Sequence, residues 1–391
     1  CGTLAYNDDA LPSEYRGNLF LADFGQRNLR RVTLERAAGT FRAVSDQLLF
    51  PDPPPDFRPV GIHETPDGRG FYICDWQHQD NKQEVTVGRL WKLTALFATN
   101  AAPLPDWYTP AALGQPGEVE IPALVSGLAH PRKQVRLTAQ RALTKRGPAA
   151  EAALRSVFVD PKAALVSRYH ALWALDAIDQ AKSIRPQVIE AVSGGAAGLA
   201  RQAMRQLGQR AARQAVPALL ARLRDPDPSL RFHAATALGR VADPQSVSAL
   251  LKALQAPEPE LWPRFAIFTA LHRVGSAHPE TWAEIAGALS VENPTARAAV
   301  GFALRDVYDL RLVEALIGVA TNRLGSMEAR ASALGWLRLM HRQVPAWKGE
   351  WWSYHPFRLT PPARTVPWAG TPRVAAALQG ALGESDERLR L

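Results

Sequence analysis

The sequence predicts a multidomain β + α protein in which an all-β unit is followed by an α-solenoid of about seven helical repeats. A phrase that begins with arginine recurs about every 33 residues between residues 136 and 337. Short apolar segments separated by turn residues fill the first hundred positions, and a Pro- and Gly-rich stretch divides the two regions. We therefore expect a β unit at 1–97, a linker at 98–118, the array at 119–345 and an aromatic, proline-rich capping segment at 346–391.

The composition is that of an ordinary soluble globular chain, with 47% hydrophobic and 21% charged residues among 391. No stretch approaches the roughly 18 uninterrupted apolar residues of a membrane helix, so no transmembrane segment is predicted. The net charge of +9 raises the question of a nucleic-acid partner. Most of the excess lies at 119–345, where 29 Lys and Arg face 18 Asp and Glu. Seven of these arginines belong to the repeat phrase, so a structural use is favoured and nucleic acid is the least favoured partner.

The two cysteines, Cys1 and Cys74, form no CxxC pair, which excludes a zinc ribbon and a c-type haem within these residues. A disulfide between them and two unpaired buried thiols both remain open. The chain opens on Cys1-Gly-Thr and not on Met, so we expect it to be an internal piece of a longer protein.

The repeat phrase places a small or apolar residue three positions after the arginine, Ala usually six after it, and then Leu. Its seven arginines are separated by 32, 33, 30, 33, 33 and 33 residues. They are Arg136 (RLTAQRAL), Arg168 (RYHALWAL), the degenerate Arg201, Arg231 (RFHAATAL), Arg264 (RFAIFTAL), Arg297 (RAAVGFAL) and Arg330 (RASALGWL). A fixed period in this range marks a stacked supersecondary unit.

Each unit is predicted to hold a first apolar helix, such as 215–223 (AVPALLARL), then a turn, then the arginine helix. The turns contain an Asp-Pro step or a relative of it, which starts a helix because the side chain caps free N–H groups. They lie at His130-Pro131, Asp160-Pro161, Asp225-Pro226, Glu258-Pro259 and Asn293-Pro294. Ala at +3 and +6 lets neighbouring helices approach closely. This pattern is typical of HEAT repeats.

The repeat arginines allow two interpretations. They can bind the turn Asp and the helix-end carbonyls of the adjacent unit and so form a ladder, or they can bind phosphates. Because Arg and Asp occur together in several units, we favour the ladder. The array then offers protein partners its concave face. His170, His233 and His272 lie on second helices and are interpreted as ordinary polar or half-buried histidines.

The first hundred residues read as two similar sets of short strands. One set begins near Thr3 and continues at 18–23, 28–34 and 40–44; the second comprises 58–62, 70–75 and 89–93. Pro66-Asp67-Gly68 supplies a turn between two of these strands, since Pro presets φ and Gly accepts a positive φ. The spacing indicates antiparallel β structure, arranged as two consecutive propeller blades.

These blades, with the string "FRPVG…PDG…YICDW" at 57–76, resemble the closing blades of quinoprotein glucose/sorbosone dehydrogenase-like propellers. The order of β unit, repeats and C-terminal aromatic segment resembles bacterial membrane-bound dehydrogenases, in which a six-bladed propeller precedes HEAT repeats and often a cytochrome c domain. The resemblance implies an extracytoplasmic protein, periplasmic or attached to the cell envelope, in which pyrroloquinoline quinone and calcium are candidate cofactors.

In that family a Lys and an Arg-x-Arg step bind the carboxylates of the quinone. Here Arg58 matches the second arginine and is the candidate cofactor-binding residue, but Asp56 occupies the first position and Gly25-Gln-Arg27 offers no Lys. The family's catalytic His would lie in blades outside these residues, so no catalytic residue is assigned. A structural use of Arg58, paired with Asp56 or Asp75, is favoured over cofactor binding.

Other candidates in the β unit are weaker. His63, Asp75, His78 and Asp80 lack metal-ligand spacing, so no metal site is predicted. Asp75-Trp76 is interpreted as a blade-closing turn. At the other end of the chain, the aromatic segment is expected to fold back along the last repeat, and a short helix is expected at 372–382. Its aromatic residues are Trp347, Trp351, Trp352, Tyr354 and Trp368.

The function predicted first is a scaffold for protein interaction, next to a sugar-oxidising propeller of the same longer chain. The alternatives are a non-enzymatic interaction protein and, last, a nucleic-acid-binding HEAT-like protein.

Overall fold

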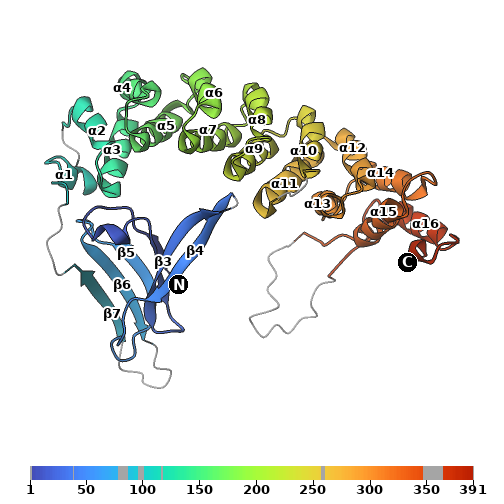
Figure 1. The fold of residues 1–391 in the computed structure, drawn as a ribbon, viewed down its shortest axis with the longest axis horizontal. Helices are drawn as coiled ribbons and strands as arrows, with labels where there is room; N and C mark the ends of the chain where they lie inside the picture. Colours follow the sequence, from blue (N-terminus) through green and yellow to red (C-terminus); the bar gives the residue numbers. More distant parts are fainter. Residues whose placement is uncertain are drawn as a thin grey trace. The chain divides into compact units, whose positions relative to one another are not determined.

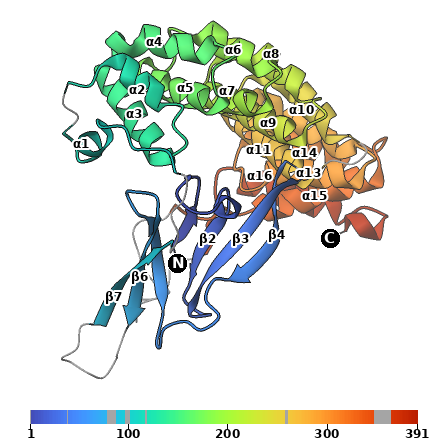
Figure 2. The same cartoon turned by 60° about the vertical axis from the view of Figure 1, so that its left-hand side comes forward.

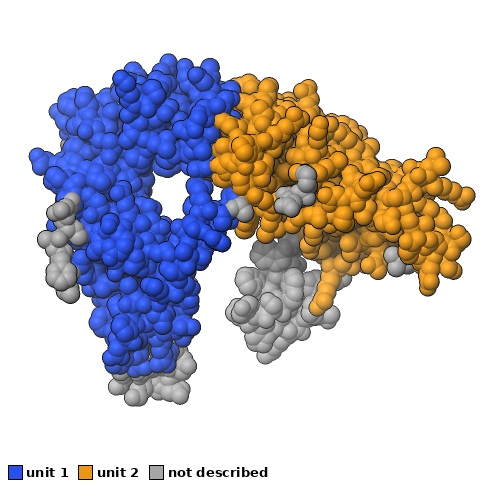
Figure 3. Space-filling view, in the orientation of Figure 1, with its two compact units in different colours: residues 1–203 blue, residues 204–391 orange. Residues whose placement is uncertain are grey.

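The computed structural model describes residues 2–37, 39–77, 87–95, 101–115, 118–256, 260–346 and 364–390. It divides into two compact units, residues 1–203 and 204–391 (Figure 3). The first unit holds the β region and the first helix pairs, and the second holds the remaining pairs. The division falls within a helix of the array, so the predicted domain boundaries at 97, 118 and 345 stay predictions.

In the described residues, seven strands build two antiparallel sheets, as the two strand sets predict (Figures 1 and 2). The first sheet has the order β1-β2-β3-β4, and the second has the order β5-β6-β7. The strands are β1 (Thr3–Ala5), β2 (Leu19–Asp23), β3 (Asn28–Ala37), β4 (Thr40–Leu48), β5 (Pro59–Glu64), β6 (Gly70–Gln77) and β7 (Val87–Thr94). The described residues form no closed barrel or propeller.

One apolar core joins the two sheets. Phe20 of β2 and Phe71 of β6 lie 4.8 Å apart between ring centroids, and Tyr6 meets the Phe71 ring edge-on. The N–H of Gly2 donates to the carbonyl of Val60, 2.7 Å away. The two sheets therefore share a core and contact each other along β1, β2 and β5.

The described part of the chain has a short helix, α1 (Tyr108–Ala112), within the predicted linker, and seven helix pairs after it. The first helices are α2 (Ile121–Gly127), α4 (Pro148–Val159), α6 (Arg185–Ser193), α8 (Val216–Arg222), α10 (Val247–Leu254), α12 (Trp282–Gly287) and α14 (Leu310–Thr321). The second helices are α3 (Lys133–Arg146), α5 (Leu165–Asp179), α7 (Ala197–Gln209), α9 (Pro228–Val241), α11 (Leu261–Ala277), α13 (Pro294–Leu304) and α15 (Met327–Met340). Short 3₁₀ turns lie at Ser13–Tyr15, Arg213–Ala215, Pro244–Ser246, Pro279–Thr281, Ala288–Ser290 and Glu387–Leu389.

Small residues set the spacing between successive second helices, as the repeat phrase predicts. A Cβ added at Gly208 would lie 2.8 Å from the Cα of Ala237, and one at Gly239 would lie 2.7 Å from the Cα of Ala270. The capping prediction is confirmed at Asn293, whose side chain accepts from the N–H groups of Thr295 and Ala296. Before α9 the cap is Asp227 and not the predicted Asp225.

The predicted ladder, in which repeat arginines bind acceptors of the adjacent unit, is wrong for most of their hydrogen bonds. The guanidinium of Arg231 donates to the carbonyls of Asp225 (2.7 Å) and Pro226 (3.0 Å), within its own repeat. Arg136 donates in the same way to the turn that precedes it, Arg168 to Phe158, Arg297 to Val291 and Arg330 to Ala320. These arginines bind backbone oxygens at the end of a first helix or in the following turn, because their side chains start in the first turn of the second helix. They are structural, as favoured, and these backbone bonds stay within one helix pair, while Arg136 also donates to His170 of the next pair and Arg231 lies 3.8 Å from Glu260 before α11.

The described part of the C-terminal segment packs on the last repeat, as predicted. Trp368 donates its ring N–H to the carbonyl of Met340 at 2.7 Å, and a β-bridge joins Gln343 to Val366. Helix α16 (Thr371–Ala381) matches the predicted 372–382, and its Arg373 pairs with Glu314 at 2.6 Å. The other named aromatics, Trp347, Trp351, Trp352 and Tyr354, lie outside the described residues.

Candidate functional site

A cluster of charged groups joins the β unit to the first helix pair in unit 1. Arg132 lies 3.1 Å from a carboxylate oxygen of Asp9, and Lys133 lies 3.3 Å from Glu64. The hydroxyl of Tyr108, from the linker helix, donates to the carbonyl of Pro66 at 3.2 Å. The linker is therefore packed against its neighbours, as predicted from its aromatics. Since each link is an ion pair or a hydrogen bond, this junction serves to hold two elements together.

Within that junction, the carboxyl of Asp8 has the most strongly shifted pKa. It is 1% exposed, one of its carboxylate oxygens has no hydrogen-bond partner, and Arg132 lies 3.7 Å from the other. Burial, with smaller contributions from Asp9 and Glu64, raises the pKa of Asp8 to about 7. Desolvation outweighs the distant guanidinium, so this carboxyl changes charge near neutral pH.

His170 is not an ordinary histidine. Its Nε2 accepts from Arg136 at 3.3 Å and its Nδ1 lies 2.7 Å from the side-chain oxygen of Gln140. Burial and the charge of Arg136 lower the pKa of His170 to about 4. The ring is therefore neutral at physiological pH, and it joins α5 to α3 through two hydrogen bonds.

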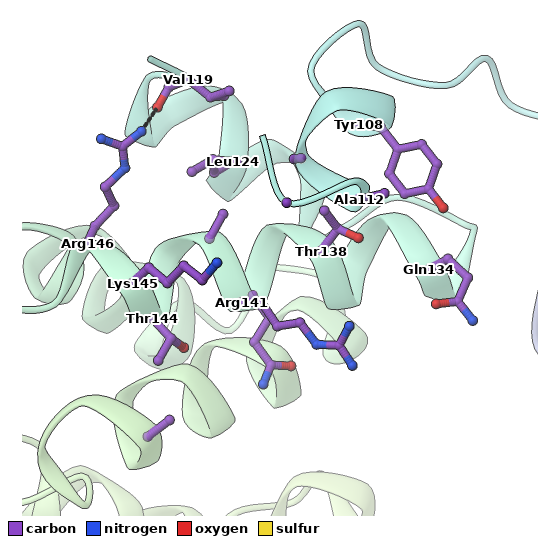
Figure 4. Close-up of a pocket in the computed structure, with 15 residues that line it drawn as sticks. Tyr108, Ala112, Val119, Leu124, Gln134, Thr138, Arg141, Thr144, Lys145 and Arg146 are labelled. Atoms are coloured by element: carbon purple, nitrogen blue, oxygen red, sulfur yellow. Dashed lines mark hydrogen bonds between the residues drawn. The ribbon is translucent and has the colours of Figure 1, made fainter. Parts of the chain in front are cut away.

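The hollow beside α3, of about 810 Å³, is lined from α1, α2, α3 and α5 (Figure 4). Its labelled side chains Gln134, Thr138, Arg141 and Lys145 come from α3, and Arg146 donates to the carbonyl of Val119 at 2.9 Å. Among the described residues that line it there is no carboxylate, histidine or cysteine. Its described lining residues therefore offer no set of carboxylate, histidine or cysteine ligands for a metal ion.

A groove of about 520 Å³ between α11 and α13, in unit 2, has a different character. It is lined by Leu261, Arg264, Phe265, Phe268, Pro294, Thr295, Ala298, Ala299 and Phe302. The ring centroids of Phe265 and Phe268 lie 5.0 Å apart, and those of Phe268 and Phe302 lie 5.5 Å apart. Phe265 and Phe302 are each 49% exposed. Three aromatic rings therefore form a continuous surface across two helices.

A hydrogen bond from a side chain joins the two helices beside the groove. Nδ1 of His272 donates to the carbonyl of Ala303 at 3.0 Å and so ties α11 to α13 beside Phe302. Phe302 also borders a second hollow, of about 330 Å³, that contains Trp336 and the 62%-exposed Leu339 of α15. The apolar surface thus continues onto a third helix.

Sequence reasoning missed this groove because its phenylalanines occupy different positions of the repeat. Phe265 follows its repeat arginine by one residue and Phe302 follows its own by five. They meet only because neighbouring second helices lie side by side. The available signal was the apolar residue five positions after the repeat arginine, where Phe302 stands and other repeats carry Arg141, Gln206 or Thr236.

The candidate cofactor residue Arg58 has a structural environment. Its backbone N–H donates to a carboxylate oxygen of Asp75 at 2.7 Å, and its guanidinium lies 5.8 Å from the centre of the Phe24 ring. The ion pair predicted for Arg58 with Asp75 is made by Arg89 instead, at 2.7 Å. The charge of Arg89 is thereby neutralised by Asp75, and the Gly25–Arg27 turn brings no Lys. These residues therefore do not fit the carboxylates of the quinone.

The remaining candidates of the β unit are also corrected. Asp75 and Trp76 lie within β6 and not in a turn, because both pair with β7. Cys74 is a free and exposed thiol, so the alternative of two buried thiols is wrong for it. Cys1, His78 and Asp80 lie outside the described residues. No group of three or more His, Cys, Asp or Glu in the described part of the chain could hold a metal ion.

Comparison with known proteins identifies the repeats. Residues 185–271 match HEAT repeats. No curated protein matches the sequence. Among the helices of the described regions, none is both long and apolar enough to cross a membrane. The chain therefore carries a HEAT-repeat scaffold, and nothing in these comparisons supports a dehydrogenase.

Several solved structures share helical repeats with the chain. The complex of CpcE and CpcF of phycocyanin lyase from Nostoc is 24% identical over 49% of this chain and 77% of that one, with a TM-score of 0.32. A HEAT-like repeat protein of the archaeon Thermococcus onnurineus is 15% identical over 57% of this chain and 98% of its own, with a TM-score of 0.34. The Mot1 N-terminal domain in complex with TBP is 14% identical over 56% and 35%, with a TM-score of 0.33. Because all three scores are below 0.5, they carry no argument about function.

Proposed function

We propose that the chain is a protein-interaction module in which the groove of α11 and α13 docks an apolar side chain of a partner protein. The observation that carries this proposal is the pair of half-exposed phenylalanines, Phe265 and Phe302, joined through Phe268 into one aromatic surface. Exposed apolar surface at the rim of a hollow is typical of interaction sites, and buried aromatic anchors dominate their binding energy.

The exposed rings supply enough area for an anchor. Half of a phenylalanine side chain corresponds to about 100 Å² of apolar surface, so covering Phe265 and Phe302 removes about 200 Å² from water. At about 25 cal/mol per Å² this stabilises a complex by at most about 5 kcal/mol. Association entropy offsets much of that gain, so the groove alone gives weak binding and a partner must make further contacts.

An enzymatic function receives less support from the described cavities. The hollow beside α3 has no carboxylate, histidine or cysteine among its described lining residues, and Asp8 and His170, whose pKa values are shifted, are buried in the structural contacts described above. A scaffold requires none of these chemistries.

The sequence resemblance supports a broader proposal about the setting. The module would lie next to a sugar-oxidising propeller of the same longer protein, outside the cytoplasm, with a cytochrome c domain as a candidate electron acceptor. Pyrroloquinoline quinone and calcium would act in blades other than the two described. Reconstitution of the longer protein with both cofactors, followed by a dye-reduction assay on aldoses, tests this setting; no turnover would refute it.

The docking proposal is tested by selecting peptides from a random phage-displayed library on the purified chain and titrating them in solution. We expect selected peptides to share an aromatic or leucine anchor and to bind the double variant F265S/F302S at least ten-fold more weakly. The matched control is L310S/L324S, which removes two exposed leucines far from the groove in sequence, 49% and 99% exposed. If the selected peptides bind both double variants equally well, the docking proposal is wrong.

A further inference from the structure

Three arginines at the ends of successive second helices have no carboxylate partner. They are Arg205 of α7, Arg240 of α9 and Arg273 of α11, and all three are exposed. No ion pair in the described part of the chain involves any of them, whereas Arg222, Arg311 and Arg373 of the same unit each pair with an acid. We call these three residues the arginine row.

The close helix spacing brings the row together. A hollow of about 530 Å³ is lined by Gly208, Gln209, Ala211, Gly239, Arg240 and Arg273. Its floor is the contact of Gly239 with Ala270 and of Gly208 with Ala237, where a side chain larger than hydrogen would collide with backbone. Burial, then the charges of Arg273 and Arg205, lower the pKa of Arg240. The cations therefore act on one another, and their field is not neutralised by the protein.

The arginine row differs from the repeat arginines in its hydrogen bonds. Arg231 and Arg297 point to backbone carbonyls and are thereby satisfied. Within the described residues, the guanidinium groups of Arg240 and Arg273 make no such bond. A guanidinium that is exposed, close to like charges and free of internal acceptors suits bidentate binding of a carboxylate.

One member of the row, Arg273, lies on α11, the helix that also carries Phe265 of the aromatic groove. Arg273 follows Phe265 by eight residues, which places it about 12 Å along α11 and less than a quarter-turn round the axis. An extended peptide covers this distance with three or four residues, at about 3.3 Å each.

We infer that the partner is an extended acidic segment, with an apolar anchor in the groove and carboxylates three or four residues away on the arginine row. This inference rests on the proposed function, because it takes the groove as the anchor site. Single-stranded nucleic acid is the less suitable occupant. Phe265 and Phe268 meet at 71°, edge to face, and Phe268 and Phe302 at 32°, so the three rings are not coplanar and line a hollow that suits a side chain better than a row of stacked bases.

The test uses a fluorescein-labelled peptide with one tryptophan, a three-residue glycine–serine spacer and four aspartates, titrated by fluorescence anisotropy. An exposed ion pair contributes about three-fold in affinity, so we expect R205Q/R240Q/R273Q to bind about 20-fold more weakly. The charge-matched control R224Q/K252Q/R323Q, on the side of the first helices, should bind within two-fold of the wild type. Raising the salt concentration should weaken wild-type binding and leave the triple row variant nearly unchanged.

Two further probes separate this inference from the docking proposal. If the peptide with asparagines in place of the aspartates binds the wild type equally well, and still loses affinity in F265S/F302S, the acidic segment is wrong and the groove stands. If F265S/F302S binds the acidic peptide like the wild type, the groove is wrong. A twenty-nucleotide oligothymidine that binds as tightly as the peptide, with the same dependence on the row, would replace the protein partner by nucleic acid and overturn the inference.

Discussion

The spacing of the second helices can be tested with a single methyl group. In the variant G239A the new Cβ would lie 2.7 Å from the Cα and 2.9 Å from the Cβ of Ala270, where ordinary contacts are 3.4–4 Å. The obstacle is backbone on a packed helix, so it cannot rotate away. Helices α9 and α11 must therefore move apart, by up to about 1 Å.

Two effects of opposite sign set the magnitude. Overpacking of this kind costs about 1–3 kcal/mol, whereas replacing Gly by Ala inside a helix stabilises it by about 1 kcal/mol. The variant should therefore be destabilised by up to about 2 kcal/mol. The matched control is G318A within α14, where an added Cβ meets nothing within 4 Å, so only the gain of about 1 kcal/mol remains.

Urea unfolding followed by circular dichroism gives the direction of both shifts. Because a repeat array need not unfold in one step, hydrogen exchange of the amides of α9 and α11 should be measured as well. We expect faster exchange there in G239A and slower exchange of α14 in G318A. If G239A is stabilised to the same extent as G318A, glycine does not set the spacing of α9 and α11. The close approach of these helices beneath the arginine row would then be wrong.

Three other predictions concern buried charges. The pKa of Asp8 is raised from 3.8 to about 7, so its contribution to stability is fully present below pH 3.8 and is lost progressively as the pH rises to about 7. D8N, which cannot ionise, should therefore stabilise the protein by about 2 kcal/mol at pH 8, by less at pH 5, and have little effect only below about pH 4, as measured by urea unfolding. The pKa of His170, lowered to about 4 from 6.5, gives the opposite sign: its contribution is present above pH 6.5 and lost as the pH falls toward 4, and its ring resonances in NMR should stay those of a neutral imidazole at pH 5.5. Arg330 is 7% exposed and donates to Ala320 and Glu384. R330M should therefore lower the free energy of unfolding by about 2–3 kcal/mol and shift the urea midpoint to a lower concentration. A midpoint equal to that of the wild type would contradict the structural use of Arg330.

The helix pairs could be predicted because every repeat buries the same positions. Ala237 and Ala270, both six residues after a repeat arginine, are fully buried against the preceding helix. A residue that must be small in every copy leaves a periodic signal, and its neighbours in the turn add the caps. The strands were visible for a related reason, since short apolar runs between turn residues show where pairing starts and ends.

The partners of individual side chains could not be predicted in the same way. Arg231 and Arg297 have the same position in the phrase, yet only the structure shows that their acceptors are carbonyls of the preceding turn. The pairing of Asp75 with Arg89 depends on strand register between β6 and β7, which a pattern of apolar residues does not specify. The groove depends on rings from two repeats and has no motif of its own.

The two sets of arginines explain how one residue type serves both stability and recognition. An arginine in the first turn of a second helix lies over the carbonyls of its own turn, so its charge is used within the repeat. Arg240 and Arg273, nine residues later, lie near the other end of their helices, where the last carbonyls lack intrahelical partners and cations are favoured by the helix dipole. The first set can vary little without loosening a helix pair. The second set is tolerated at little energetic cost in the free protein, and its uncompensated charge is available to a partner.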